Sequence, residues 1–173
     1  MIRLAAAAAL LLFAASAAEA GGLDLHAFPQ RPEAPGFEID SLDGGRFDLS
    51  ALKGQVVVVN FWATWCAPCI REMPALQALK DNPGANGVTV LAVNTGQKPE
   101  IVRRFLERIG VDLPVLLDRD ESVKKRWAVR VMPTTYVVDP DGRVAFGAIG
   151  ERNWNDEKIV KRLRELHQNG NKP

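Results

Sequence analysis

The stretch that decides the fold is Val56-Val57-Val58-Val59-Asn60-Phe61-Trp62-Ala63-Thr64-Trp65-Cys66-Ala67-Pro68-Cys69. It opens with a run of four valines, which is typical of a strand buried on both faces in the middle of an α/β sheet. A helix is expected to begin at Cys66, because apolar residues then recur at helical spacing, at Ile70, Met73, Leu76 and Leu79. Pro74 lies inside this helix and is expected to kink it. The stretch therefore predicts a central strand that leads into a helix with two cysteines at its start.

Strand and helix patterns alternate along the rest of the chain. Antiparallel hairpins are predicted over 37–48, around Asp43-Gly44-Gly45, and over 135–146, around Asp139-Pro140-Asp141-Gly142. Between them lie strands at 88–93 and 115–117 and helices at 99–110 and 122–128, and a last helix starts near 155. The apolar face of the helix at 99–110 is made of Ile101, Val102, Phe105, Leu106 and Ile109. Strand–helix alternation that ends in a hairpin and a helix predicts a mixed sheet with helices on both faces.

The first twenty residues are typical of a secretory signal peptide. Arg3 precedes an apolar run from Leu4 to Ala15, and Ala18-Glu19-Ala20 places small residues at a cleavage site. An uncleaved membrane anchor is the alternative, although a span needs about 20 apolar residues. We therefore expect export to the periplasm, where disulfides persist. The expected division is signal peptide 1–20, linker 21–35, one domain 36–168 and flexible tail 169–173.

The charges of the chain nearly cancel. The 22 Lys and Arg residues face 21 Asp and Glu residues, so the formal net charge is +1. Such a chain makes no field that would gather nucleic acid. We expect a monomer without a nucleic-acid partner.

Cys66 and Cys69 carry the chemistry that the sequence indicates. At a helix N-terminus Cys66 meets unpaired backbone N–H groups and the positive end of the helix dipole, and both favour its thiolate. Cys69 lies one turn further on the same side of the helix, and Pro68 removes an N–H that the first turn does not need. Cys66 is thus predicted to attack a partner disulfide and Cys69 to resolve the mixed disulfide. A merely stabilising disulfide explains the pair less well, because so small a loop gives little entropic gain.

Metal chemistry fits the cysteine pattern less well. The chain has two cysteines in all, so a four-cysteine zinc site is excluded, and Ile70 stands where covalent haem attachment needs histidine. Copper(I) on the two thiolates, with Met132 as a soft third ligand, remains an alternative. Packing explains Met132 equally well. We expect no cofactor or metal besides the redox-active Cys66–Cys69 disulfide.

Taken together, these motifs resemble the TlpA/ResA/CcmG group of exported thioredoxin-like proteins. Residues 58–69, with Glu72, Met73 and Pro74 after them, resemble the active-site segment of the group, and Met132-Pro133-Thr134 resembles the cis-proline loop of thioredoxins. The likeness covers about residues 35–166. It implies a thioredoxin-like fold with an N-terminal β-hairpin and a central helix–strand insertion over 99–117.

The resemblance also implies roles around the cysteines. Pro133 is expected to be cis and to lie against the cysteine pair, so that Met132 offers backbone groups to an extended partner chain. Trp65 is expected to contact partners, because aromatic residues are enriched at interfaces. The predicted partner-binding residues are thus Trp65, Met132, Pro133 and Thr134.

Asn60, Pro68 and Pro74 are expected to support the site. Thioredoxin has a buried aspartate where this chain has Asn60, and an amide cannot accept a proton, so the base for Cys69 is Glu72 or water. Glu72 matches a glutamate that the group places near the second cysteine, which implies a part in proton transfer. An exposed helix charge is the other interpretation of Glu72, and the sequence leaves both open.

These features predict a thiol–disulfide oxidoreductase. The first hypothesis is a reductase of partner protein thiols, in roles of the cytochrome c maturation or copper-site assembly type, recharged by a membrane thiol reductant. The alternatives are an oxidant that inserts disulfides and a copper(I)-binding chaperone. A thiol peroxidase ranks last, because related peroxidases carry Pro and Thr ahead of the reactive cysteine and Trp62-Ala63-Thr64-Trp65 lacks that arrangement.

Overall fold

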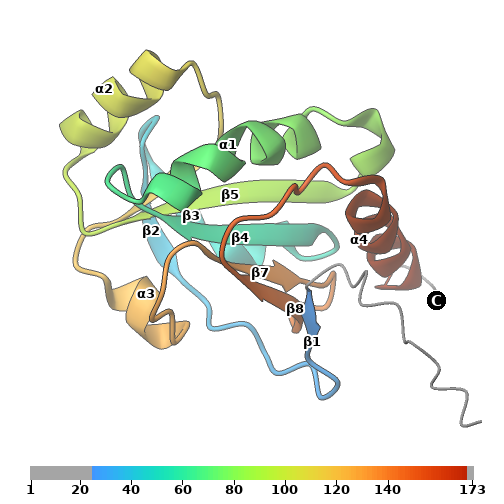
Figure 1. Ribbon diagram of the computed structural model, residues 1–173. Coiled ribbons are helices and arrows are strands. Elements are labelled where there is room, and N and C mark those ends of the chain that lie inside the picture. Colours follow the sequence, from blue (N-terminus) through green and yellow to red (C-terminus); the bar gives the residue numbers. More distant parts are fainter. Residues whose placement is uncertain (1–24, 171–173) are drawn as a thin grey trace, which may run out of the picture.

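A mixed sheet of eight strands forms the centre of the structure, a computed structural model that describes residues 25–170 (Figure 1). The strands are β1 His26–Ala27, β2 Glu38–Ser41, β3 Arg46–Asp48, β4 Val56–Trp62, β5 Val88–Thr95, β6 Val115–Asp118, β7 Thr134–Val138 and β8 Val144–Ile149. The helices are α1 Ala67–Lys80, α2 Pro99–Ile109, α3 Ser122–Arg126 and α4 Glu157–Gly170, with 3-10 turns η1 Leu49–Leu52 and η2 Pro83–Ala85. The predicted signal peptide lies outside the described residues.

The strand order β1-β8-β7-β4-β5-β6-β2-β3 places β4 in the interior of the sheet. β4 pairs in parallel with β5, from Val56 beside Val88 to Trp62 beside Asn94, and β5 pairs in parallel with β6. β4 pairs antiparallel with β7, and β7 with β8. This is the mixed sheet that the alternation of strands and helices predicts.

Alternate residues of β4 face two different cores. Val56, Val58 and Trp62 pack in a core with residues of α1, α2 and α4, whereas the residues between them pack on the opposite face with residues of α3 and η1. In Figure 1, α1 and α2 accordingly lie above the sheet and α3 below it. All seven residues of β4 are buried, which confirms the strand covered on both faces.

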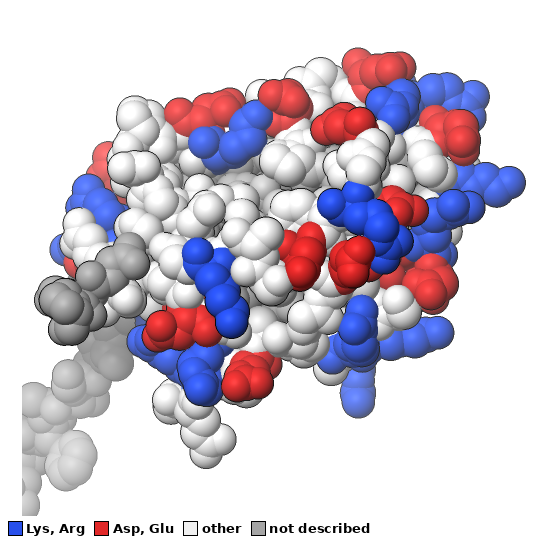
Figure 2. Space-filling view, turned by 180° about the vertical axis from the view of Figure 1, so that it is seen from behind, with Lys and Arg blue, Asp and Glu red and all other residues white. Residues whose placement is uncertain are grey.

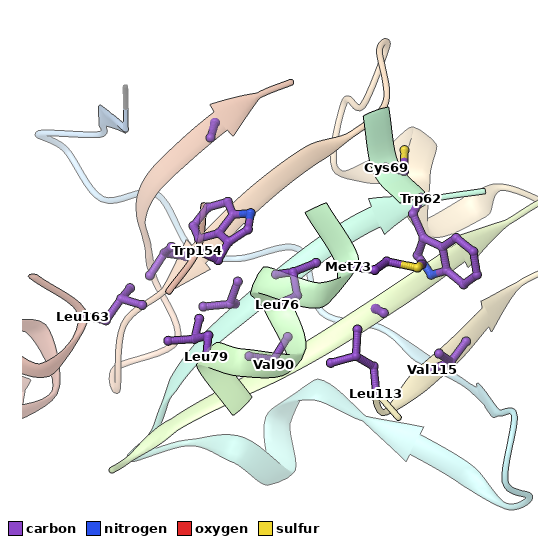
Figure 3. Close-up of a cluster of buried hydrophobic side chains, with 14 of the residues drawn as sticks. Trp62, Cys69, Met73, Leu76, Leu79, Val90, Leu113, Val115, Trp154 and Leu163 are labelled. Atoms are coloured by element: carbon purple, nitrogen blue, oxygen red, sulfur yellow. The ribbon is translucent and has the colours of Figure 1, made fainter. Parts of the chain in front are cut away.

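The first of these cores fixes α1 over the sheet. Figure 3 shows Met73, Leu76 and Leu79 of α1 lying near Trp62 and Trp154, and each of the three is at most 1% exposed. Burying one such side chain stabilises a fold by about 1.5–3 kcal/mol. The end of α1 that carries the cysteines is therefore held in place by its own apolar stripe.

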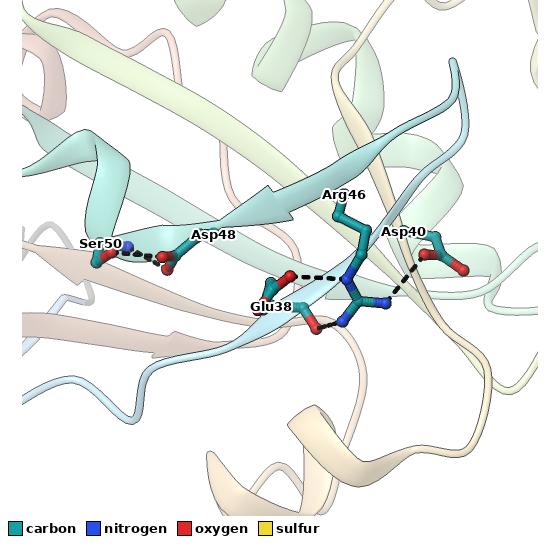
Figure 4. Close-up of polar contacts among 5 residues, drawn as sticks. All are labelled: Glu38, Asp40, Arg46, Asp48 and Ser50. Carbon is teal, nitrogen blue, oxygen red and sulfur yellow. Dashed lines mark hydrogen bonds and ion pairs between the residues drawn. The ribbon is translucent and has the colours of Figure 1, made fainter.

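The predicted N-terminal hairpin is present as β2 and β3, and β2 pairs with β6 to join it to the sheet. Arg46 lies across the two strands, with Nε 2.8 Å from Glu38 Oε1 and Nη1 3.4 Å from Asp40 Oδ1 (Figure 4). Asp48 ends the hairpin, and its Oδ1 accepts a hydrogen bond from the Ser50 N–H at 2.8 Å. These ion pairs are exposed, and the face in Figure 2 shows basic and acidic side chains interleaved.

Part of the expected linker 21–35 belongs to the sheet, namely His26–Ala27 and the isolated bridge of Glu33 with Arg143. β1 pairs with β8, and the Phe28 and Ala34 N–H groups donate to Ala145 O and Gly142 O at 3.0 and 2.9 Å. This edge strand has two residues and is held by main-chain hydrogen bonds to β8. Its sequence therefore carries no alternation of apolar and polar residues that would predict a strand.

At the other end of the domain, α4 runs to Gly170, beyond the expected boundary at 168. β8 also continues three residues past the expected end, to Ile149. No helix between residues 25 and 170 has the length and apolar character that a bilayer span requires.

A buried carboxylate anchors the β7–β8 turn. Asp139 Oδ1 accepts from the Asp141 and Arg143 N–H groups at 3.1 and 2.9 Å, and Oδ2 lies 3.3 Å from Arg31 Nη1. Asp139 thus also ties the N-terminal lead-in to the sheet.

We expect Asp139→Ala to lower the free energy of unfolding by about 1–3 kcal/mol, because turn N–H groups lose their acceptor. Urea denaturation measures the change. Asp141→Ala, on the exposed side of the same turn, serves as the control and should stay within about 0.5 kcal/mol. Equal losses for the two variants would contradict the assignment.

Candidate active site

Cys66 and Cys69 form a disulfide at the start of α1. Cys66 is the N-cap residue, one position before the helix proper, and its Sγ accepts a hydrogen bond from the Cys69 N–H at 3.3 Å. That N–H is one of those that the first turn of a helix leaves without an intrahelical partner. Cys66 is 5% exposed and Cys69 0%. The arrangement gives Cys66 a donor for a negative charge and the greater access to solvent.

The loop from β4 to α1 is held by Gln97, which lies between β5 and α2. Gln97 Nε2 donates to Thr64 Oγ1 at 2.8 Å, and its Oε1 accepts from the Thr64 N–H at 2.8 Å. The same oxygen accepts from Nδ2 of buried Asn94 at 3.0 Å. A single amide therefore fixes the loop two residues before Cys66. No motif in the sequence points to Gln97, because its partner is 33 positions away.

The Met132-Pro133-Thr134 loop lies at the same end of the sheet, since Thr134 pairs with Phe61 near the end of β4. The Met132–Pro133 peptide bond is cis, as the resemblance implies. Pro133 O accepts from the Gly150 N–H at 2.8 Å, which ties the loop to the end of β8.

The side chain of Thr134 is only 4% exposed, and its hydroxyl donates to Val131 O at 2.7 Å. It therefore fixes the loop from within. The expectation that Thr134 belongs to the partner-binding residues, with Met132 and Pro133, stays a prediction that concerns its main chain.

Glu72 is buried, with 2% of its surface exposed, so its interpretation as an exposed helix charge is wrong. Its Oε1 accepts from Asn60 Nδ2 at 2.7 Å. Its Oε2 accepts from Trp154 Nε1 and from the Arg152 N–H, each at 3.2 Å. These two partners lie 82 and 80 positions away along the chain, so sequence reasoning missed both.

Burial raises the pKa of Glu72 from its ordinary 4.5 to about 7, although the hydrogen bonds from Asn60, Trp154 and Arg152 each act to lower it. The nearby charge of Glu151 adds to the rise. A carboxyl group with a pKa near neutrality can both take up and release a proton under physiological conditions.

Asn60 donates a hydrogen bond to this carboxyl group. It is 1% exposed and lies on β4, and its Nδ2 also contacts Thr135 Oγ1 at 2.9 Å. The amide offers an N–H donor to Glu72, which fixes the position of the carboxyl group.

Two prolines lie within α1. Pro68 occupies the second position of the helix, where its missing N–H has no intrahelical partner to lose. Pro74 is exposed and lies inside the helix, which continues through it to Lys80.

Trp65 stands out from this compact site, with 70% of its surface exposed beside Cys66. Within residues 25–170, no cluster of three or more His, Cys, Asp or Glu side chains is placed to hold a metal ion. Met132 Sδ, the third copper ligand of the alternative hypothesis, accepts a hydrogen bond from Thr95 Oγ1 at 3.3 Å.

The chain is similar to known proteins over most of its described length. The pattern of the AhpC/TSA family matches residues 31–146. The thiol-disulfide oxidoreductase ResA of Bacillus subtilis (strain 168) is 39% identical over 112 residues, which cover 65% of this chain and 63% of that protein. The chain thus spans slightly less than two thirds of that relative. ResA of Bacillus thuringiensis subsp. konkukian is 33% identical over 134 residues, covering 78% and 76% of the two chains.

Solved structures agree with this relationship. A thiol:disulfide interchange protein of the thioredoxin family from Chlorobium tepidum TLS has a TM-score of 0.68 and 27% identity, covering 79% of this chain and 99% of that one. MTB DsbF, in mixed oxidized and reduced forms, has a TM-score of 0.66 and 27% identity, covering 75% and 94%. The chain therefore belongs to the AhpC/TSA family, among the thiol–disulfide oxidoreductases of thioredoxin-like fold.

Proposed function

We propose that the protein is a disulfide reductase that acts on partner proteins through the Cys66–Cys69 pair. The observation that carries the proposal is the position of Cys66 Sγ, which accepts the Cys69 N–H at the start of α1. A thiolate formed there gains the helix N-terminus as its stabilising environment. Cys69 is buried one turn behind it and is placed to attack it.

The proposed cycle transfers two electrons to the partner. The Cys66 thiolate attacks one sulfur of a partner disulfide, so that a bond to Cys66 forms and the other partner sulfur leaves as a thiolate. Cys69 then loses its proton and attacks Cys66 Sγ, which forms the Cys66–Cys69 disulfide and releases the second partner thiolate. An external dithiol, which we assign to a membrane thiol reductant, returns the pair to the reduced form.

Glu72 is proposed to accept the proton of Cys69. It follows Cys69 by one helical turn and is buried with it, and its pKa of about 7 suits a group that holds a proton transiently. Asn60 is proposed to position this carboxyl group, since it donates to Oε1 at 2.7 Å.

Partners are proposed to dock on Trp65 and on the loop of Met132 and Pro133. Trp65 is highly exposed, and Val131 and Ile149 add further exposed apolar surface at 56% and 66%. Ile149 belongs to this surface because it pairs with Thr134, at the end of the loop. An extended chain is the form of partner that hydrogen-bonds to free main-chain groups at such an edge.

We place this activity outside the cytoplasm, because the signal-like sequence of residues 1–20 predicts export. The proposed substrates are disulfides of proteins in cytochrome c maturation or copper-site assembly, which the cycle returns to thiols. The nearly neutral chain makes no field that would gather nucleic acid, and we propose a monomer without a nucleic-acid partner.

Trapping experiments test the order of attack. Cys69→Ser should accumulate mixed disulfides with partner proteins, because Cys66 attacks and the resolving thiol is missing. Cys66→Ser should not. Non-reducing gels of cell extracts, with both variants expressed at equal level, provide the measurement. Equal trapping by the two variants, or trapping only by Cys66→Ser, would overturn the assignment.

The reduction potential tests the direction of electron flow. Ala67 and Pro68 carry no charge, so only the helix terminus and its backbone N–H groups stabilise the Cys66 thiolate. The reduced form is therefore stabilised little relative to the disulfide, which makes the couple a weak oxidant. We therefore expect a potential nearer to roughly −270 mV, as in thioredoxin, than to the roughly −120 mV of DsbA. Equilibration with glutathione buffers gives the value. A result above about −180 mV, that of protein disulfide isomerase, would favour the oxidant instead.

The pH dependence of stability tests the state of Glu72. Because its pKa is raised on folding, the folded protein keeps the proton between about pH 4.5 and 7 while the unfolded chain has lost it. The free energy of unfolding should therefore fall as the pH rises through this range, by about 3 kcal/mol at most, and level off above it.

Glu72→Gln should remove this fall, as measured by urea unfolding of the disulfide form from pH 4 to 8. Glu165→Gln, on the exposed side of α4, is the matched control and should retain it. Parallel curves for wild type and Glu72→Gln would show that Glu72 ionises normally.

A further inference from the structure

A pocket with an apolar floor and basic walls adjoins the active-site loop. It has a volume of about 290 Å³ and is lined by Thr64, Ile101, Arg104, Phe105 and Arg108. Thr64 precedes exposed Trp65 directly and lies two residues before Cys66. Two residues of chain span at most about 7 Å, so this wall of the pocket lies close to the reactive sulfur.

The other four lining residues come from one face of α2. They stand at spacings of three, four and seven residues, which places them side by side on a helix. Phe105 is 7% exposed and forms the floor with the core behind it. The sequence places Ile101 on the apolar face of this helix, yet its side chain is 42% exposed. An apolar side chain is therefore presented beside the active site without protein covering it.

The two arginines of the pocket are not used by the fold as ion-pair partners. Arg104 Nε donates to Glu100 O within its own helix at 3.2 Å, and the Arg108 guanidinium lies 5.2 Å from the centre of the Phe105 ring. Neither pairs with a carboxylate of the described residues, although Glu100 and Glu107 are on the same helix.

Some other cations of the protein do pair with carboxylates. Arg71 pairs with Glu151, and Lys80 lies 2.8 Å from Asp112. What sets the guanidiniums of Arg104 and Arg108 apart is their place in a pocket beside the active-site loop, where they keep free donors. A planar guanidinium is well suited to bind a carboxylate. The complementary ligand is an acidic side chain with an apolar neighbour.

We propose that this α2 pocket selects substrate proteins by an acidic residue near the cysteine under attack. This inference rests on the proposed reductase function and adds a specificity determinant to it. When a partner sulfur meets Cys66, a carboxylate two to four residues along the partner chain reaches the pocket, because each extended residue spans about 3.3–3.6 Å. Ile101 then packs on the apolar part of the same segment.

The test uses two synthetic peptides, each with one cysteine carried as a mixed disulfide with 5-thio-2-nitrobenzoate. One peptide has Asp and Glu two to four residues from the cysteine on both sides, and the other has Asn and Gln there. The Cys66 thiolate of the reduced protein attacks the peptide sulfur, the Cys66–peptide disulfide forms, and the coloured thiolate leaves. Its absorbance gives the rate of attack on each peptide.

The measured quantity is the ratio of the acidic to the neutral rate at low ionic strength. Any change in the acidity of Cys66 itself affects both peptides and cancels in this ratio. Arg104→Gln/Arg108→Gln should lower the ratio by about two- to thirtyfold, since each of the two exposed ion pairs contributes about 0.2–1 kcal/mol and 1.4 kcal/mol is a factor of ten. Added salt should lower the ratio of the wild type in the same direction.

Lys158→Gln/Arg164→Gln is the matched control, because it removes the same charge from exposed positions of α4. This variant should keep the wild-type ratio. An unchanged ratio in Arg104→Gln/Arg108→Gln, or an equal drop in the α4 control, would overturn the pocket as a specificity site while leaving the reductase in place. Failure of the wild type to attack either peptide would count against the proposed function itself.

Discussion

The hydrogen bond from the Cys69 N–H to Cys66 Sγ is the contact on which the arrangement of the active site depends. This hydrogen bond forms only if Cys66 is the N-cap residue of α1, so the helix has to begin directly after Cys66. β4 determines that start, because a strand buried on both faces has no freedom to slide in the sheet. The Gln97 amide then fixes the loop between them through Thr64. The reactive sulfur of Cys66, which is only 5% exposed, is thus held with the rigidity of the core.

The parts of this fold that were predictable are those with local causes. The four valines of β4, the helical spacing behind Cys66 and the Asp139–Gly142 turn each carry their structure in adjacent residues. β1 and Gln97 have no such signal, because their partners lie far along the chain. The same holds for Trp154, whose indole reaches Glu72 across 82 positions. Ile101 shows the opposite error: its spacing is that of a core residue, yet the shape of the surface leaves it exposed.

Glu72 illustrates how a fold can hold a carboxyl group near neutrality. Burial alone would push the pKa far up, because the charged form loses its water. The three donors from Asn60, Trp154 and Arg152 act against this, since each hydrogen bond is stronger to the carboxylate than to the acid. The result is a pKa of about 7, between the two extremes. The ionised form costs stability, because the carboxylate is buried away from water. Retaining a titratable group here is therefore understandable if its proton is used.

Selectivity has to come from surfaces outside the cysteine motif. Ala67 and Pro68 offer no charge or hydrogen-bonding side chain, so the motif itself treats all accessible disulfides alike. Thiol exchange also requires only that sulfurs meet in line, which many extended segments can do. The two edges of the site differ in character, with apolar Val131 and Ile149 near the Pro133 loop and basic Arg104 and Arg108 on α2. A partner that crosses Cys66 with an apolar side on one edge and an acidic side on the other makes favourable contacts with both. A partner that carries a cation in place of the acidic residue is repelled by the two arginines. The difference between the two edges can therefore discriminate between substrates that react equally well with Cys66.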